Sequence, residues 1–119
     1  WVWIEGNHDP GPIGVGGTHT AEFTAGPLVF RHIADPTKEG EVSGHFHPKV
    51  TLNLPARSIT RRCLIKDASR IIMPAFGTYT GGLSVLSEPL CSLLKDPALC
   101  VLIDGKVAQP MPRPDPKNR

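Results

Sequence analysis

Glycine and proline interrupt this chain so often that only short regular elements fit between them. The 119 residues include 12 glycines and 13 prolines, about twice the usual share. The apolar runs between these turn residues are short, which is typical of strands rather than of long helices. We therefore expect a strand-rich chain with few helices. No run of about 18 apolar residues is present, which excludes a transmembrane helix.

Charge and cysteine content narrow the class of protein. The formal net charge is only +2, so no global field draws in nucleic acid. Basic residues nevertheless lie close together at Arg57, Arg61, Arg62, Lys66 and Arg70. They form either a solvated face or an edge that contacts phosphate, and the first three are our candidates for substrate binding. The three cysteines lack a C-x-x-C pair, which favours reduced thiols and a cytoplasmic protein.

Turn residues and apolar runs predict where the elements lie. Strands are expected at 1–5, 28–33, 41–43, 62–66, 70–73, 101–103 and 106–108, the last four as two hairpins. The strand at 28–33 has the apolar run of a buried strand. Residues 83–94 are the one long helix that the pattern allows, and 18–23 carry one helical turn at most. From residue 110 the proline-rich chain is expected to be a loose tail.

Polar side chains gather at the ends of three predicted strands. They are Asn7-His8-Asp9, His32, and the pair His45 and His47. Strand ends that meet at one edge of a sheet form ligand sites, and imidazole with amide oxygen suits Mn, Fe or Zn. Each cluster alone has an ordinary interpretation as a turn, a core histidine or an exposed loop. Their combination predicts a metal site, and His19 lies outside it in a glycine-rich loop.

The order of these clusters resembles a known family. GNHD, then a single His, then GHxH is similar to the second half of the calcineurin-like metallophosphoesterases. The stretches GEVSGHFHPK and RCLIKDASRIIMPAFGTYTGGLSVL most resemble the bacterial ligase-associated DNA-damage-response metallophosphoesterases. The resemblance runs from Val2 to about Leu86, and the family's earlier D-x-H and G-D motifs are absent.

The resemblance implies a fold and a domain organisation. The fold is part of an α/β/β/α sandwich, in the α/β class. Residues 1–109 are expected to be the C-terminal part of one such domain, and residues 110–119 its tail. The N-terminal part of the domain is then an expected partner. Alone, the chain should bind metal weakly and hydrolyse little.

The resemblance also implies a catalytic site. Asn7, His32 and His45 would hold one divalent ion and His47 a second, with manganese expected and zinc or iron as alternatives. Ions about 3.5–4 Å apart would hold a bridging hydroxide that attacks phosphorus. His8, oriented by Asp9, would protonate the leaving oxygen. Tyr79, in a glycine-rich segment, would border the substrate. Phe76 or Tyr79 could stack on a base, with a position in the core as an equal alternative for Phe76.

The function implied is a phosphodiesterase or endonuclease that cleaves nucleic acid during the DNA damage response. Three alternatives stay open. The first is a phosphodiesterase or phosphatase for a small nucleotide. The second is a non-catalytic assembly module for a DNA ligase or helicase, and a homo-oligomer is a further possibility for its assembly. The third is a cupin-type barrel, which is disfavoured because Val50 to Asn53 follow GHFH where a glutamate is expected.

Overall fold

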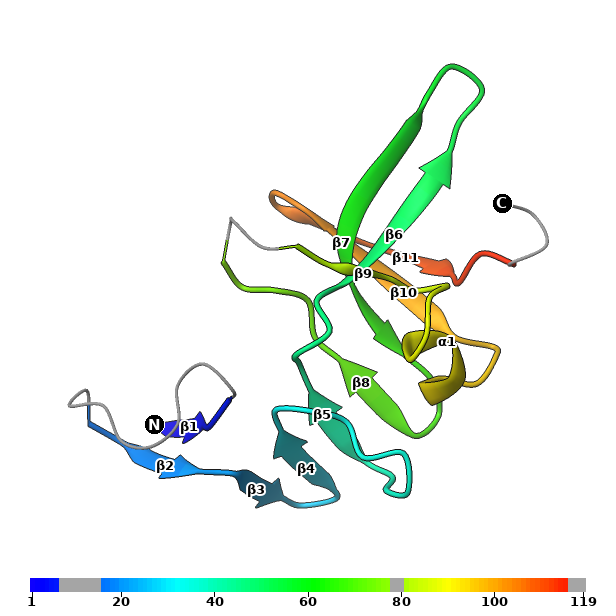
Figure 1. Cartoon of the computed structure of the whole chain (residues 1–119). Helices are drawn as coiled ribbons and strands as arrows, with labels where there is room; N and C mark the ends of the chain where they lie inside the picture. Colours follow the sequence, from blue (N-terminus) through cyan, green and yellow to red (C-terminus); the bar gives the residue numbers. More distant parts are fainter. Residues whose placement is uncertain (7–15, 78–80, 116–119) are drawn as a thin grey trace.

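The computed structural model describes residues 1–6, 16–77 and 81–115, and in these ranges the regular structure is almost entirely strand, joined by turns and loops (Figure 1). The strands are β1 (Val2–Ile4), β2 (Thr18–Thr20), β3 (Glu22–Ala25), β4 (Leu28–Arg31), β5 (Glu41–Ser43), β6 (Pro48–Asn53), β7 (Ser58–Lys66), β8 (Arg70–Ile72), β9 (Leu83–Ser84), β10 (Leu99–Asp104) and β11 (Val107–Pro112). The one helix of these ranges is α1 (Leu90–Leu93), far shorter than the about 20 residues that span a bilayer.

The strands form a large mixed sheet and a small parallel pair. The large sheet has nine strands, with the order β11-β10-β7-β8-β5-β4-β3 and with β6 paired to both β7 and β9. In this sheet, β4, β5 and β8 run parallel to one another. β3 pairs antiparallel with β4, β7 with β8, β10 with β7, and β11 with β10. β1 and β2 pair separately. The prediction of a strand-rich chain is confirmed, but α1 is the only covering helix in the described ranges, so the finer sandwich class stays a prediction.

The long helix predicted at 83–94 is wrong. Leu83 instead opens β9, and its N–H donates to the carbonyl of His47 (3.1 Å) while the Val85 N–H donates to Lys49 (2.9 Å). α1 begins only after Pro89, whose ring removes a backbone donor and is tolerated at a helix start but not inside a helix. Pairing with β6 and the position of Pro89 therefore outweigh the helical pattern.

Three further segments differ from expectation. Residues 18–23 are not a helical turn, because β2 finds a partner in β1 and β3 finds one in β4. β6 and the first half of β7 were not predicted, and they form a long antiparallel hairpin that projects from the body of the molecule (Figure 1). β11 continues through Pro112, so residues 110–112 pair with β10 instead of forming a loose tail.

The hydrophobic core lies between the C-terminal half of the sheet and the segment that carries α1. Its buried side chains include Val50, Cys63, Ile65, Ile72, Val85, Leu90, Leu94, Cys100 and Leu102. A hydrogen bond with the Cys100 thiol, together with burial, raises the pKa of the Cys63 thiol. A thiol kept protonated in this way is inert as a nucleophile.

The N-terminal strands, by contrast, leave large apolar side chains exposed. They are Trp1, Val2, Trp3, Phe23, Leu28 and Ile33. The expectation that 28–33 is a buried strand is therefore wrong, since β4 is half-buried at most. β3 is an edge strand of the large sheet, and all four of its residues are exposed.

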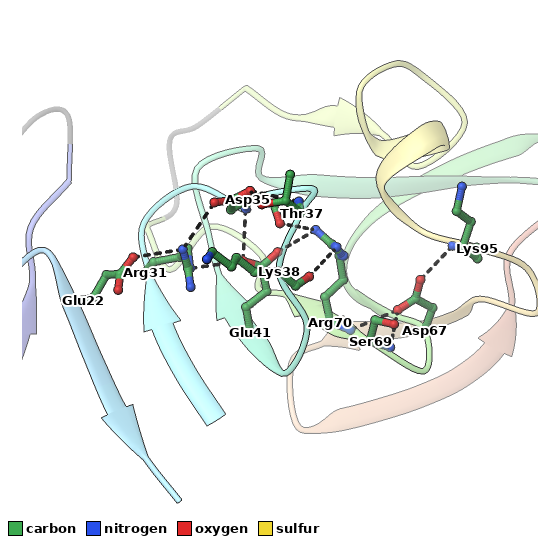
Figure 2. A network of polar contacts seen from close by, with 10 residues as sticks. All are labelled: Glu22, Arg31, Asp35, Thr37, Lys38, Glu41, Asp67, Ser69, Arg70 and Lys95. Atoms are coloured by element: carbon green, nitrogen blue, oxygen red, sulfur yellow. Dashed lines mark hydrogen bonds and ion pairs between the residues drawn. The ribbon is translucent and has the colours of Figure 1, made fainter. Parts of the chain in front are cut away.

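A buried ion network ties the parallel strands together (Figure 2). The Glu41 side chain has no exposed surface and lies between two arginines. Arg70 Nη1 donates to Glu41 Oε1 at 2.6 Å, and Arg31 Nε lies 3.1 Å from Glu41 Oε2 as an ion pair, without hydrogen-bond geometry. Arg31 also reaches the exposed Glu22 at 2.9 Å. The network joins β4, β5 and β8 on one face of the sheet.

Asp67 holds the turn between β7 and β8. Its carboxylate accepts hydrogen bonds from the backbone N–H groups of Ser69, Arg70 and Lys95, at 2.7, 3.0 and 2.8 Å. Burial acts to raise the pKa of this carboxyl group, but these donors and the charge of Arg70 outweigh it and hold the pKa below its ordinary value. Asp67 therefore fastens the hairpin to the segment that follows α1.

Candidate functional site

Two of the predicted metal ligands lie side by side. His32 directly follows β4, and His45 comes two residues after β5, the parallel neighbour of β4. The Gly44 N–H donates to the carbonyl of His32 at 2.9 Å, which holds the two strand ends together. His32 Nε2 and His45 Nδ1 are 3.1 Å apart. The rings meet edge-on, with centroids 5.0 Å apart and planes at 77°.

The backbone at His45 and His47 is in the left-handed region, with φ of 71° and 51°. In the described part of the chain they are the only non-glycine residues with positive φ. Such a conformation costs about 1–3 kcal/mol and persists only where the surroundings enforce it. Here Phe46, between them, packs against the core. Strain of this kind concentrates at functional sites, so its position at the two histidines of GHFH supports a functional role.

His47 lies in a separate small pocket of about 160 Å³ at the base of the β6–β7 hairpin. The pocket is lined by His47, Lys49, Thr60, Arg62, Ala75, Gly81 and Gly82. Three hydroxyl or cationic side chains of the hairpin, those of Lys49, Thr60 and Arg62, thus lie beside the imidazole. The sequence-based candidates missed Lys49 and Thr60, because β6 was not recognised as a strand. The alternation of polar and apolar residues in KVTLN was the signal that indicates it.

The other predicted site residues divide into three groups. Arg57 lies in the exposed turn at the tip of the hairpin. Arg61 and Arg62 are neighbours on β7 and so point to opposite faces, with Val50 and Lys49 as their respective partners on β6. Asn7, His8, Asp9 and Tyr79 lie outside the described residues.

The described residues contain a pair of candidate ligands and no complete ion site. Among them, no three His, Cys, Asp or Glu side chains gather closely enough to hold an ion. His32 does, however, line a broad open pocket together with Glu5 and Gly6. Gly6 is the residue directly before Asn7 in the sequence. The end of β1 therefore reaches the neighbourhood of His32.

The fold matches part of a nuclease. It is similar to the crystal structure of nuclease MPE from Pseudomonas putida, with a TM-score of 0.65 and 24% sequence identity. The similarity covers 92% of this chain and 53% of the nuclease chain. The chain thus spans about half the length of that protein, and the likeness is one of fold. No protein-family model matches the sequence, and no curated protein does.

Gly82 is predicted to be required for the position of His47. A Cβ built on Gly82 would lie 2.7 Å from the carbonyl oxygen of His47, closer than real contacts allow. A Cβ on the neighbouring Gly81 would meet nothing within 4 Å. We expect Gly82→Ala to lower the free energy of unfolding by about 1–3 kcal/mol. Gly81→Ala should be neutral or stabilise by up to about 1 kcal/mol.

Urea denaturation of the two variants measures this difference. Both variants replace a glycine by alanine at adjacent positions, so both reduce the flexibility of the unfolded chain by the same amount. A difference between their unfolding free energies therefore reports on the folded state. Equal unfolding free energies for Gly82→Ala and Gly81→Ala would contradict the close contact with His47.

Proposed function

We propose that this chain supplies metal ligands to a two-ion phosphodiesterase site that cleaves nucleic acid. The observation that carries the proposal is the 3.1 Å approach of His32 Nε2 and His45 Nδ1 at neighbouring strand ends. It is supported by the strained backbone at His45 and His47 and by the similarity in fold to a nuclease.

The spacing of the two imidazoles fits a shared ion. Nitrogen ligands bind Zn²⁺ at about 2.0–2.1 Å, which puts two ligands on one ion about 2.8–3.4 Å apart for angles between octahedral and tetrahedral. The observed 3.1 Å falls in this range. Imidazole nitrogen with an amide oxygen suits manganese, iron or zinc. Asn7 is proposed as the third ligand, because Gly6 lines the same pocket as His32.

The remaining roles follow the family resemblance. His47 is proposed to hold the second ion, whose other ligands would come from outside this chain. Two bound metal ions would act as Lewis acids that stabilise negative charge on the phosphoryl group. His8 is proposed to donate a proton to the leaving oxygen, with Asp9 orienting the imidazole. Of this chain's own groups, His8 is thus the proton donor and Asp9 its positioning residue.

Nucleic acid is the proposed substrate because of the positive charge of the β6–β7 segment, of which Lys49 and Arg62 line the pocket of His47. Residues 48–66 contain five lysines and arginines and no carboxylate. The backbone phosphates of nucleic acid are drawn to such a cluster even when the net charge of the whole protein is small. A role in DNA repair within the cytoplasm, with a ligase or helicase as partner, is the wider setting that we propose.

The test is hydrolysis of an activated bis-aryl phosphodiester in the presence of manganese. We expect weak turnover that a chelator abolishes and added manganese restores. His45→Ala should abolish it, whereas His19→Ala, a histidine outside the proposed site, should not. Turnover that survives the chelator, or wild-type turnover no higher than that of His45→Ala, would contradict the proposal.

A further inference from the structure

One face of the β6–β7 hairpin is polar along its whole length. The register pairs Lys49 with Arg62, Thr51 with Thr60, and Asn53 with Ser58. Because side chains alternate between faces, these six residues share one face. The intervening pairs, Val50 with Arg61 and Leu52 with Ile59, occupy the other face. Only the second face carries apolar side chains that pack against the core.

Hydrogen bonds order the outer part of this polar face. The hydroxyls of Thr51 and Thr60 lie 2.9 Å apart. The Ser58 hydroxyl donates to Asn53 Oδ1 at 2.7 Å. All four side chains are exposed to solvent. The face is thus an ordered row of donors and acceptors rather than a set of loose side chains.

The row begins at the candidate site and leads away from it. Lys49, Thr60 and Arg62 line the same pocket as His47. From there the hairpin extends away from the body of the molecule (Figure 1). Five residues of β6 at about 3.3 Å each give the row a length of about 13–17 Å.

Arg62, on the polar face, holds the backbone on both sides of Phe76. Its Nη1 donates to the carbonyl oxygens of Ala75 (3.0 Å) and Gly77 (2.7 Å), which flank Phe76. Phe76 is fully exposed, at 104% of its reference surface. One exposed apolar ring alone is ordinary at a protein surface. The backbone on both sides of Phe76 is, however, held by the same arginine, which makes the exposed ring available for stacking at a fixed place. Ala75, next to the ring, also lines the His47 pocket.

We infer that the polar face of β6–β7 and Phe76 form a binding track for an unpaired nucleic-acid strand that leads to His47. Phe76 stacks on a base, while Lys49 and the hydroxyls bind the sugar-phosphate backbone. The flat faces of bases are available to an aromatic ring only when the strand is not in a duplex. Arg62 acts as a positioning residue for Phe76. The inference rests on the proposed function only in naming the strand as substrate.

The first test is binding, measured by fluorescence anisotropy with a chelator present so that no strand is cleaved. The probes are labelled oligodeoxythymidylate, oligouridylate and a DNA duplex at one fixed salt concentration. We expect Phe76→Ala to weaken binding of the single strands by about 5- to 150-fold, the range for loss of one base stack. Duplex binding should change by less than about twofold. Phe76→Trp should restore single-strand binding, and Trp1→Ala, which removes another exposed aromatic ring, should not affect it.

The second test addresses the polar row. Thr51→Glu places a carboxylate among the proposed phosphate contacts and should weaken binding of both single strands. Thr24→Glu is the matched control, because Thr24 is an exposed strand residue on β3, away from the hairpin. Of the DNA and RNA probes, the one bound more tightly identifies the natural strand.

The outcomes separate this inference from the proposed function. If Phe76→Ala binds single strands as well as the wild type does, or weakens duplex binding equally, the track is overturned. If Thr51→Glu and Thr24→Glu have the same effect, the polar row is overturned. Binding through Phe76 without any metal-dependent hydrolysis would leave the track standing and would contradict the proposed function instead.

Discussion

Glu41→Ala is expected to lower the free energy of unfolding by about 3–5 kcal/mol, the largest stability effect of any single change considered. The Glu41 carboxylate has no exposed surface and is enclosed by Arg31 and Arg70, whose side chains are 11% and 5% exposed. Removing the carboxylate takes the counter-ion from Arg70 in a poorly solvated space, and it leaves Arg31 with the more exposed carboxylates of Glu22 and Asp35. A loss of this size is a large share of the about 5–15 kcal/mol that stabilises a typical domain.

Glu22→Ala is the matched control. Glu22 is also a glutamate paired with Arg31, at 2.9 Å, but its side chain is 58% exposed. Exposed ion pairs contribute about 1 kcal/mol or less. Urea denaturation at neutral pH measures both variants, and Glu41→Gln, which keeps the side chain's shape, provides a milder change should Glu41→Ala fail to fold. If Glu41→Gln and Glu22→Ala lose equally little stability, the buried network does not stabilise the sheet.

The network bears on the site because it fixes the strands that carry the histidines. Arg31 directly precedes His32, and Glu41 opens β5, whose far end leads to His45. β4 and β5 pair over only two residue pairs. The ion network therefore adds a second connection between strands whose relative position sets the distance between the two imidazoles.

The second large effect is expected at His8. In the complete two-ion site, His8→Ala should lower turnover by about 10²–10⁴-fold, the usual contribution of general acid catalysis. The loss should shrink for a nitrophenolate leaving group, which needs no proton. His45→Ala should remove activity on every substrate, because it removes a proposed metal ligand. A loss that depends on the leaving group therefore indicates a proton donor, whereas a loss on every substrate indicates a metal ligand.

Steady-state rates on an alkyl and a nitrophenyl phosphodiester, with metal analysis of each variant, measure this contrast. Equal slowing of both substrates by His8→Ala, or loss of metal from that variant, would show that His8 is not the proton donor. The prediction rests on the family resemblance, since His8 lies outside the described residues.

Much of the strand pattern was predictable because local signals and tertiary partners agree. The hairpin across Asp104-Gly105 and the turn at Asp67 carry strong turn chemistry, and both pairs of strands form as predicted. β5 has the predicted bounds. In each case short apolar runs are bounded by residues that favour turns.

The missed elements depend on partners far away in the sequence. β9 pairs with β6 across more than thirty residues, and no local pattern at Leu83 or Ser84 reports this. The turn of the β6–β7 hairpin, Leu54-Pro55-Ala56-Arg57, lacks the Asn-Gly or Asp-Gly signal of tight hairpins. The buried Arg31–Glu41–Arg70 network was not predicted either, because charged residues give no sequence signal of burial.

For the candidate site, the sequence identified the histidines but not their surroundings. That His32 and His45 follow strand ends was predictable from the apolar runs and turn residues, whereas the parallel pairing of these two strands is known only from the fold. Two features of the site depend on the fold and could not be predicted. One is the left-handed backbone at His45 and His47. The other is the pocket that places Lys49, Thr60 and Arg62 beside His47. The roles of Asn7, His8, Asp9 and Tyr79 stay predictions.

The most direct measurement of the central claim is manganese or zinc binding by calorimetry to the wild-type protein and three histidine variants. If His32 and His45 share one ion, His32→Ala and His45→Ala should each weaken binding at least about tenfold, since even partners behind the direct ligands contribute about 10- to 100-fold. His19→Ala should bind as the wild type does. Unchanged affinity in His32→Ala or His45→Ala, or an equal loss in His19→Ala, would contradict the shared metal site.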